Sequence, residues 1–428
     1  MKKETEVFLF GAGAVINWGG PTTKELTKLI RECGFRIKGS KTRITEFIYN
    51  RLIEKGYTAE EVNFETIINV IEELSIYYSE YNKATRTPSI LQAFLKDDDL
   101  DSILNFSIEG GERKHEYKLQ IPLGVEYSSA KRAINAENPN QFFLQHLLAL
   151  LITNINDRII EYSIHSDLHS VIDKQSKTSI LFKYWMQSID RNKTLRIYTL
   201  NYDRVFKVLL NDMGIKYFEG YNSSDTIADM DGLRADVPRI FNDINSNIHY
   251  NLHGSAFWKV LSQDKGQFPN PEVVYTGYPE FPINEDLSSV QIEKGKQVFL
   301  TNIITGYQKA QKGMITPFKQ MHSAFDRDCC NTSKIYIVGY SFGDEHINES
   351  IKTGLRHNEN LTLEIVDPCF ISNKLDEKLS STIFQFIDGT PLVPEKIGDN
   401  KYSYFNDRVI VYTLGFIQYL ELKKSLRF

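Results

Sequence analysis

The chain has 428 residues, of which 41% are hydrophobic and 12% aromatic, so it can bury a sizeable core. Fifty basic and fifty-five acidic residues give a net charge of -5, which excludes a chain-wide pull toward nucleic acid or an anionic membrane. The most apolar stretch, FFLQHLLALLI at 142–152, is too short to span a bilayer, and only four apolar residues precede the first glycines. We therefore expect a soluble, cytoplasmic protein without a secretory signal and without direct nucleic-acid or membrane binding.

Cysteine usage points to a reducing compartment. The four cysteines, Cys33, Cys329, Cys330 and Cys369, include no pair with the C-x-x-C spacing of a zinc site. Their number is also low for a secreted scaffold that depends on disulfides. We expect reduced thiols and no metal ion.

Short β-rich runs recur along the chain, and each one ends in a polar or glycine-containing loop. Runs of four to six apolar or β-branched residues bounded by turn signals are typical of buried strands in a parallel sheet. The runs are EVFLF before Gly11, LRIYTL before Asn201, IHYNL before His253, KIYIV before Gly339 and LTLEIV before Asp367. A further run, RVIVYTL at 408–414, is expected to add an edge strand.

The region between the first two runs is mainly helical. In FETIINVIEEL, five apolar residues share one helical face, namely Phe64, Ile67, Ile68, Ile71 and Leu74. QFFLQHLLALLITNI predicts a second helix with a start signal in NPN, whereas HEYKLQIPLGV at 115–125 breaks the helical trend. Residues 211–247 are rich in Asp, Asn and Gly and read as an irregular loop.

These patterns predict an α/β fold with a Rossmann-like parallel sheet and a large, mainly helical insertion. We assign 1–23 and 191–428 to the sheet and 24–190 to the insertion.

The first loop is rich in glycine. Gly11, Gly13 and Gly20 follow the first strand, Pro21 suits a first helical turn, and Thr22 or Thr23 can cap the helix. A strand, a glycine turn and a helix present backbone N–H groups to a phosphate. The spacing matches neither G-x-G-x-x-G nor a Walker A loop, so a purely structural turn stays open.

Polar residues follow the other strands at the sheet edge where open α/β folds bind ligands. Asn201 and Asp203 follow the second run, and either one could instead cap a helix. His253 follows the third run and can act as a general base near neutral pH, although a lone histidine is weak evidence. Gly339 and Ser341 could hold a phosphate or ribose, or form a turn in which Ser341 or Asp344 caps the next helix.

The order of these loops resembles the sirtuin signature. The sirtuin Gly-Ala-Gly loop is similar to Gly11-Ala12-Gly13, and its later Pro aligns with Pro21. Thr-Gln-Asn-Ile-Asp looks like 199–203, the catalytic His-Gly looks like His253-Gly254, and Gly-Thr-Ser looks like 339–341. The resemblance covers the strands and loops of the sheet, and not the insertion or the C-terminus. It implies that the opening loop holds the pyrophosphate of NAD.

Three departures separate the chain from deacylating sirtuins. It lacks their zinc module with two C-x-x-C pairs, it has Thr22-Thr23-Lys24 where they have Asp-Phe-Arg, and it carries the helical insertion. These departures resemble the sirtuin-like NAD-hydrolase domains of bacterial antiphage defence systems. That resemblance implies an NAD glycohydrolase that depletes cellular NAD, with Asn201, Asp203 and His253 as catalytic residues. It implies NAD contacts from Gly11, Ala12, Gly13, Ala14, Val15, Gly20, Pro21, Thr22, Gly339, Ser341, Phe342 and Asp367.

Three alternatives stay open: an NAD-dependent protein deacylase, a non-catalytic NAD or ADP-ribose sensor, and a structural subunit. By resemblance we also expect a homo-oligomer and a regulatory partner, such as a helicase-like ATPase or an Argonaute-like protein. The sequence does not distinguish a linear ADP-ribose product from a cyclic one.

Overall fold

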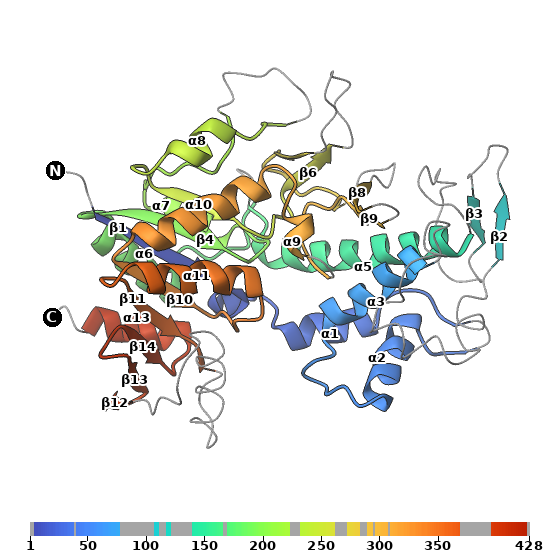
Figure 1. Ribbon diagram of the computed structural model, residues 1–428, viewed down its shortest axis with the longest axis horizontal. Coiled ribbons are helices and arrows are strands. Elements are labelled where there is room, and N and C mark those ends of the chain that lie inside the picture. Colours follow the sequence, from blue (N-terminus) through green and yellow to red (C-terminus); the bar gives the residue numbers. More distant parts are fainter. Residues whose placement is uncertain are drawn as a thin grey trace.

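The computed structural model describes residues 4–37, 40–77, 107–110, 117–120, 139–165, 169–222, 232–261, 272–282, 289–293, 296–306, 309–368 and 395–425. Its centre is an eight-stranded sheet in the order β12-β13-β14-β11-β10-β1-β4-β5 (Figure 1). The strands are β1 (Glu4–Phe10), β4 (Lys193–Thr199), β5 (Ile248–Asn251), β10 (Lys334–Val338), β11 (Thr362–Val366), β12 (Glu395–Gly398), β13 (Lys401–Tyr404) and β14 (Val409–Tyr412). The predicted α/β class and the five predicted strands are confirmed.

Every pairing from β14 to β5 is parallel, whereas β12 and β13 pair in the antiparallel sense. The expectation that 408–414 forms an edge strand is wrong. β14 lies inside the sheet, because the β12–β13 hairpin pairs with its outer side. The edge strands are therefore β12 and β5.

Successive side chains of a strand point to opposite faces of a sheet, and both faces are covered here. Phe8 and Phe10 of β1 pack against α6 (Lys177–Asp190), α7 (Val205–Asp212) and α13 (Phe416–Ser425). Val7 and Leu9 pack on the other face, against α8 (Val237–Asn242), α10 (Phe318–Asn331) and α11 (Glu345–His357). Because helices cover both faces of the sheet, side chains on both sides of the parallel strands are buried. This explains why these strands are nearly continuous apolar runs in the sequence.

The region between β1 and β4 is mainly helical, as predicted, and four of its helices form a lobe beside the sheet (Figure 1). They are α1 (Thr23–Arg31), α2 (Ile44–Glu54), α3 (Phe64–Tyr77) and α5 (Pro139–Ser163). The apolar face predicted for 64–74 is buried and packs against α5. The last helix before β4, α6, instead packs on β4 and α13. The division at 23 and 190 stays a prediction.

Two segments differ in part from the expected picture. Residues 211–247, read as an irregular loop, contain α8, whose first turn is capped by the Asp236 carboxylate accepting from the Arg239 N–H at 3.1 Å. Within 115–125 the structure describes β3 (Tyr117–Gln120), which pairs with β2 (Ser107–Gly110). Two more hairpins, β6 (Trp258–Leu261) with β7 (Glu272–Tyr275) and β8 (Ser289–Glu293) with β9 (Lys296–Phe299), and the short helix α9 (Lys309–Lys312) complete the described strands and α-helices.

Candidate functional site

A cavity of about 370 Å³ lies at the carboxyl ends of β1, β4, β5, β10 and β11. This volume falls in the range of about 300–1,000 Å³ that is usual for small-molecule sites. Eleven of the residues predicted from the sequence line it, namely Gly11, Ala12, Gly13, Val15, Pro21, Thr22, Asn201, His253, Gly339, Ser341 and Asp367. Four others, Ala14, Gly20, Asp203 and Phe342, do not line it. The parallel sheet thus brings five separate stretches of chain to one cavity.

The glycine loop leaves β1 and continues into a 3₁₀ helix, η1 (Ala12–Trp18). Its glycines allow close contact with the loop after β10. A Cβ on Gly11 would lie 2.4 Å from the Gly339 oxygen, and a Cβ on Gly339 would lie 2.3 Å from the Ala14 nitrogen. Gly339 also has a φ of 63°, a conformation that favours glycine. The two loops therefore interlock along their backbones at the floor of the cavity.

The hydrogen bonds of this loop change the expected mode of phosphate binding. Gly11 N–H donates to the Val338 carbonyl (2.9 Å), Gly13 N–H to the Gly339 carbonyl (2.9 Å), and Ala14 N–H to the Gly11 carbonyl (3.0 Å). Three of the five N–H groups predicted to face a phosphate are therefore already bonded within the protein. Ala12 begins η1, so its N–H has no partner within the helix, and it has none elsewhere among the described residues.

The chain then enters α1 through a capping box. Thr22 is the N-cap: its hydroxyl accepts from the Glu25 N–H at 3.2 Å, and the Glu25 carboxylate accepts from the Thr22 N–H at 2.7 Å. The predicted Thr22 cap is confirmed, but the placement of Pro21 in the first helical turn is wrong. Pro21 precedes the cap, because the Thr22–Glu25 pair fixes the start of the helix at Thr23.

Asn201 is buried and holds the glycine loop. Its side-chain amide donates to the Gly11 carbonyl at 2.9 Å, and its backbone N–H donates to the Thr199 hydroxyl at 3.0 Å. Asn251 of β5 in turn donates to the Asn201 carbonyl at 3.0 Å. The side chain thus ties the end of β4 to the end of β1, and it does not cap α7.

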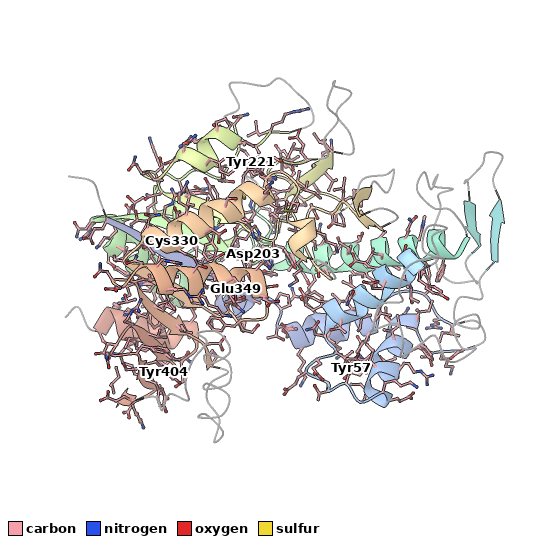
Figure 2. All side chains as sticks on the ribbon, viewed as in Figure 1. Tyr57, Asp203, Tyr221, Cys330, Glu349 and Tyr404 are labelled. Carbon is pink, nitrogen blue, oxygen red and sulfur yellow. The ribbon has the colours of Figure 1, made fainter. Side chains whose placement is uncertain are left out.

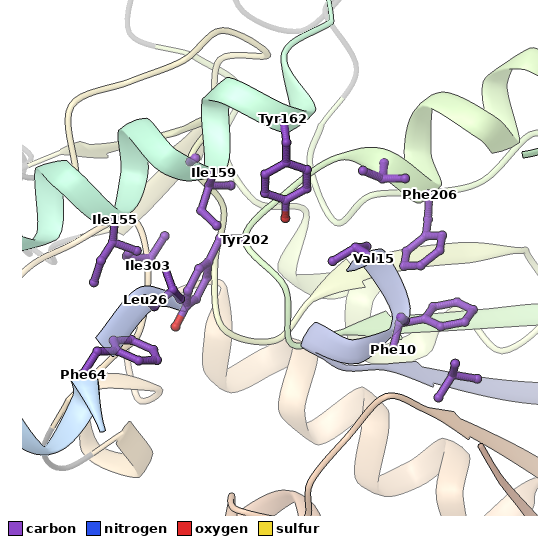
Figure 3. Packing of buried hydrophobic residues seen from close by; sticks show 14 of the residues in the cluster. Phe10, Val15, Leu26, Phe64, Ile155, Ile159, Tyr162, Tyr202, Phe206 and Ile303 are labelled. Atoms are coloured by element: carbon purple, nitrogen blue, oxygen red, sulfur yellow. The ribbon is translucent and has the colours of Figure 1, made fainter. Parts of the chain in front are cut away.

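Asp203 lies deep inside the molecule, where α5 meets the sheet (Figure 2). Its carboxylate accepts from the Tyr162 hydroxyl (2.8 Å) and from the Val205 N–H at the start of α7 (2.8 Å). Burial raises the pKa of Asp203, and these two hydrogen bonds oppose the rise. Tyr162 lines the cavity, and Figure 3 shows Tyr162 and Ile159 projecting from α5 toward the loop that carries Tyr202. Asp203 therefore does not line the cavity itself but is hydrogen-bonded to Tyr162, which does.

His253 follows β5 and lines the cavity while only 3% of its surface is exposed. Its Nε2 is buried and has no hydrogen-bond partner among the described residues. Burial lowers the pKa of His253 well below its usual range, so the ring is neutral at pH 7. His346 and His322 lie nearby, with ring centroids 5.9 and 6.5 Å from that of His253. His253 therefore brings a neutral imidazole ring to the wall of the cavity.

Sequence reasoning missed a charged wall of the cavity. Lys309 contacts the carboxylates of Glu65 and Asp344, each at 2.7 Å, and all three residues line the cavity. Burial raises the pKa of Asp344, but His253 and Lys309 outweigh this effect and hold the value at about 2. These three residues come from the insertion, from α9 and from the loop after β10. No spacing in the sequence relates them, and only the fold brings them together.

The remaining predicted residues hold the loops after β10 and β11. Phe342 adopts a positive φ of 58°, and its carbonyl accepts from the Asn348 side chain at 2.9 Å. Asp344 is the N-cap residue of α11 but makes no side-chain capping bond, because its carboxylate binds Lys309. Asp367 is buried, and its N–H donates to the Tyr412 carbonyl at 3.1 Å.

Within the described ranges, no three His, Cys, Asp or Glu side chains are arranged to hold a metal ion. Cys33, Cys329 and Cys330 are free thiols, and Cys369 lies outside those ranges. None of the described helices is both long and apolar enough to cross a lipid bilayer.

Comparison with known proteins bears on this site. Residues 195–378 match the family model of the SIR2-like domain. Two solved structures resemble the chain. One is a Sir2 homologue in complex with NAD, at 11% identity and a TM-score of 0.32, with 86% of this chain and 78% of that chain covered. The other is a mutant Sir2 homologue in complex with 2′-O-acetyl ADP ribose, at 13% identity and a TM-score of 0.31, with 91% and 95% covered. No curated protein matches.

The matched residues run from β4 past β11 and contain Asn201, His253 and the loop after β10, whereas the glycine loop precedes them. Residues 195–378 are thus similar to the SIR2-like domain, and together with β1 they carry the loops of this cavity to a single edge of the sheet.

Proposed function

We propose that the protein is an NAD glycohydrolase, which cleaves NAD⁺ into nicotinamide and ADP-ribose or a cyclic form of it. The observation that carries this proposal is His253. Its ring lines a cavity walled by two interlocked glycine loops, and its buried Nε2 has no hydrogen-bond partner among the described residues. Residues 195–378, which contain His253, match the model of the SIR2-like domain.

The two loops offer groups for the nucleotide. The N–H of Ala12, which is unbonded among the described residues, suits a pyrophosphate oxygen, and Ser341 lines the same cavity. Asp367, at the end of β11, suits the hydroxyls of the adenosine ribose. Asn201 keeps one amide hydrogen and its Oδ1 for the nicotinamide ribose, since its other amide hydrogen is donated to Gly11.

The reaction needs a base more than an acid. The bond between C1′ of the ribose and the nicotinamide nitrogen breaks, its electron pair leaves with nicotinamide, and the sugar becomes oxocarbenium-like. Water attacks C1′ and loses a proton to the neutral imidazole of His253, which gives ADP-ribose. Attack by an atom of the adenine would give the cyclic product instead. The leaving group departs neutral without protonation, which fits the lack of an acid role for His253 at neutral pH.

We propose further that this activity serves antiphage defence by depleting cellular NAD. Continuous hydrolysis would harm the host cell, so the enzyme must be controlled by self-assembly or by a partner protein, such as a helicase-like ATPase or an Argonaute-like protein. This part of the proposal rests on the sequence resemblance. It predicts that cellular NAD falls after phage infection in cells that express the chain and stays constant with His253→Ala.

The primary test is nicotinamide release from NAD⁺ by the purified protein, alone and with the products of adjacent genes, followed by chromatography. We expect release by the wild type and a loss of about 10²–10⁴-fold in His253→Ala, the usual contribution of a general base. The same chromatogram separates ADP-ribose from the cyclic product.

Other results would assign the alternatives. Nicotinamide release that depends on an added acetyl-lysine peptide would make the protein a deacylase. A thermal shift with NAD but no release under any condition would make it a sensor. The absence of both would contradict NAD binding altogether and leave the glycine loops as structural turns.

A further inference from the structure

His253 faces a physical difficulty when it acts as a base. Taking a proton places a positive charge on a ring that is 97% buried, and an uncompensated buried charge is costly. The charged and titratable groups that act on it are Asp344, Lys309, His346 and His322. Only Asp344 carries a negative charge, so only Asp344 can compensate the protonated ring.

Lys309 would cancel this compensation if it were alone with Asp344. Its ammonium lies 2.7 Å from the Asp344 carboxylate, and the pair has no net charge. Glu65 changes the balance, because it contacts the same ammonium at 2.7 Å. Burial raises the pKa of Glu65, and the Lys309 ammonium opposes this rise. With both carboxylates ionised, the cluster has a net charge of -1 in the cavity wall that His253 also lines.

We propose that Asp344 is a positioning residue that compensates the charge of His253 as this ring accepts a proton. We propose also that Glu65, from the helical insertion, preserves this effect by neutralising Lys309. The proposal deepens the proposed NAD hydrolysis, but its central claim concerns the basicity of His253. The insertion thus contributes to the chemistry through α3, and displacement of α3 would leave Lys309 to neutralise Asp344, so that the protonated His253 ring would lose its compensating charge.

The chain supplies a matched control on the same two helices. Lys312 of α9 pairs with Glu72 of α3, seven residues after Glu65, and also donates to the Thr305 carbonyl. Neither Lys312 nor Glu72 lines the cavity. Glu65→Gln and Glu72→Gln therefore each break one link between α3 and α9, but only Glu65→Gln changes the charge of the cavity wall.

The experiment measures the nucleophilicity of His253 without NAD. Diethylpyrocarbonate acylates a neutral imidazole nitrogen, and the transition state develops positive charge as it does in proton acceptance. The folded full-length protein is treated at pH 7.5, and the rate at His253 relative to the exposed His357 is followed by mass spectrometry of peptides. We expect this ratio to fall roughly threefold to thirtyfold in Asp344→Asn and Glu65→Gln. We expect no change in Glu72→Gln and partial recovery in Asp344→Glu.

The parallel measurement is nicotinamide release, in which Asp344→Asn and Glu65→Gln should lower kcat and leave KM for NAD unchanged. An unchanged ratio in Asp344→Asn would overturn the proposal, as would an equal fall in Glu72→Gln and Glu65→Gln. A wild-type His253 that neither reacts nor supports NAD cleavage would also overturn it, because the ring would not be a base open to the cavity. A reactive His253 with the expected shifts but without NAD cleavage would support this inference and contradict the proposed function.

Discussion

The side-chain amide of Asn201 donates a hydrogen bond to the carbonyl of Gly11 at 2.9 Å. The two residues are 190 positions apart in the sequence, but β1 and β4 are parallel neighbours whose last residues, Phe10 and Thr199, lie opposite each other. The bond therefore joins the glycine loop to the loop of the proposed catalytic residues. Asn201 shapes the site as well as lining it.

Replacement of Asn201 should uncouple these loops. Asn201→Ala leaves the buried Gly11 carbonyl without its donor, which we expect to cost roughly 1–3 kcal/mol of unfolding free energy. We also expect a weaker thermal shift with NAD and loss of nicotinamide release. Asn201→Asp should be at least as harmful, because a carboxylate cannot donate to Gly11. An Asn201→Ala protein with wild-type stability and wild-type NAD response would show that the bond does not hold the loop.

A methyl group at Gly339 should disrupt the interlocked loops. Gly339→Ala combines a φ of 63° with a Cβ only 2.3 Å from the Ala14 nitrogen, so backbone must move. We expect a lower melting temperature and no thermal shift with NAD. Gly343→Ala is the control in the same loop, since the nearest atom to its Cβ is the Ser341 hydroxyl at 3.7 Å. Equal effects of the two substitutions would argue against the interlock.

The sequence predicted the sheet well because its signals are local. Each strand is a short apolar run, and parallel strands bring their carboxyl ends to one edge, so His253 and Ser341 could be placed at one site. The position of RVIVYTL could not be predicted in the same way, since the pairing of β14 with β13 leaves no mark on β14 itself.

The charged wall and the role of Asp203 were beyond sequence reasoning for another reason. Glu65, Lys309 and Tyr162 look like ordinary residues of amphipathic helices or loops, and their meaning comes from partners distant in the chain. Asp203 is the acidic residue of the motif at 199–203, but the Tyr162 hydroxyl from the insertion donates to its carboxylate. Tertiary contacts of the insertion thus decide which side chains face the cavity.

The Tyr162–Asp203 bond should give a pH-dependent stability. Burial raises the pKa of Asp203, so the protonated carboxyl stabilises the folded state at low pH. This stabilisation is lost as the pH rises from the unfolded pKa of about 3.9 through the higher folded pKa. Tyr162→Phe removes a donor to the carboxylate and raises the folded pKa further. We expect the variant to lose roughly 1.5–3 kcal/mol at pH 8 and less at pH 4.5, measured by urea unfolding.

Tyr202→Phe is the matched control for this pH dependence. Tyr202 is also buried and lines the cavity, but its hydroxyl donates to the uncharged carbonyl of Ile304 at 2.9 Å. Its loss of stability should be the same at pH 4.5 and pH 8. If Tyr162→Phe also lost the same stability at pH 4.5 and pH 8, the pKa of Asp203 would not depend on its hydrogen bond with Tyr162.

The buried ion pair between Arg196 and Asp328, on the face of the sheet that packs against α10, should affect stability but not activity. The Arg196 guanidinium is fully buried, and its Nε contacts the Asp328 carboxylate at 2.6 Å, while the Tyr198 hydroxyl donates to the same oxygen at 2.6 Å. Asp328→Asn leaves the Arg196 charge buried without its partner, which we expect to cost about 3–5 kcal/mol. Tyr198→Phe removes only one donor and should cost less.

Neither Asp328 nor Tyr198 lines the cavity. Nicotinamide release measured well below the melting temperature should therefore stay at the wild-type rate in Asp328→Asn and Tyr198→Phe. Urea unfolding monitored by circular dichroism gives the stability, and chromatography gives the rate. Because the pair sits between β4 and α10, an Asp328→Asn protein that unfolds like the wild type would show that Arg196 finds other compensation in the Asp243 and Ser246 carbonyls it already contacts.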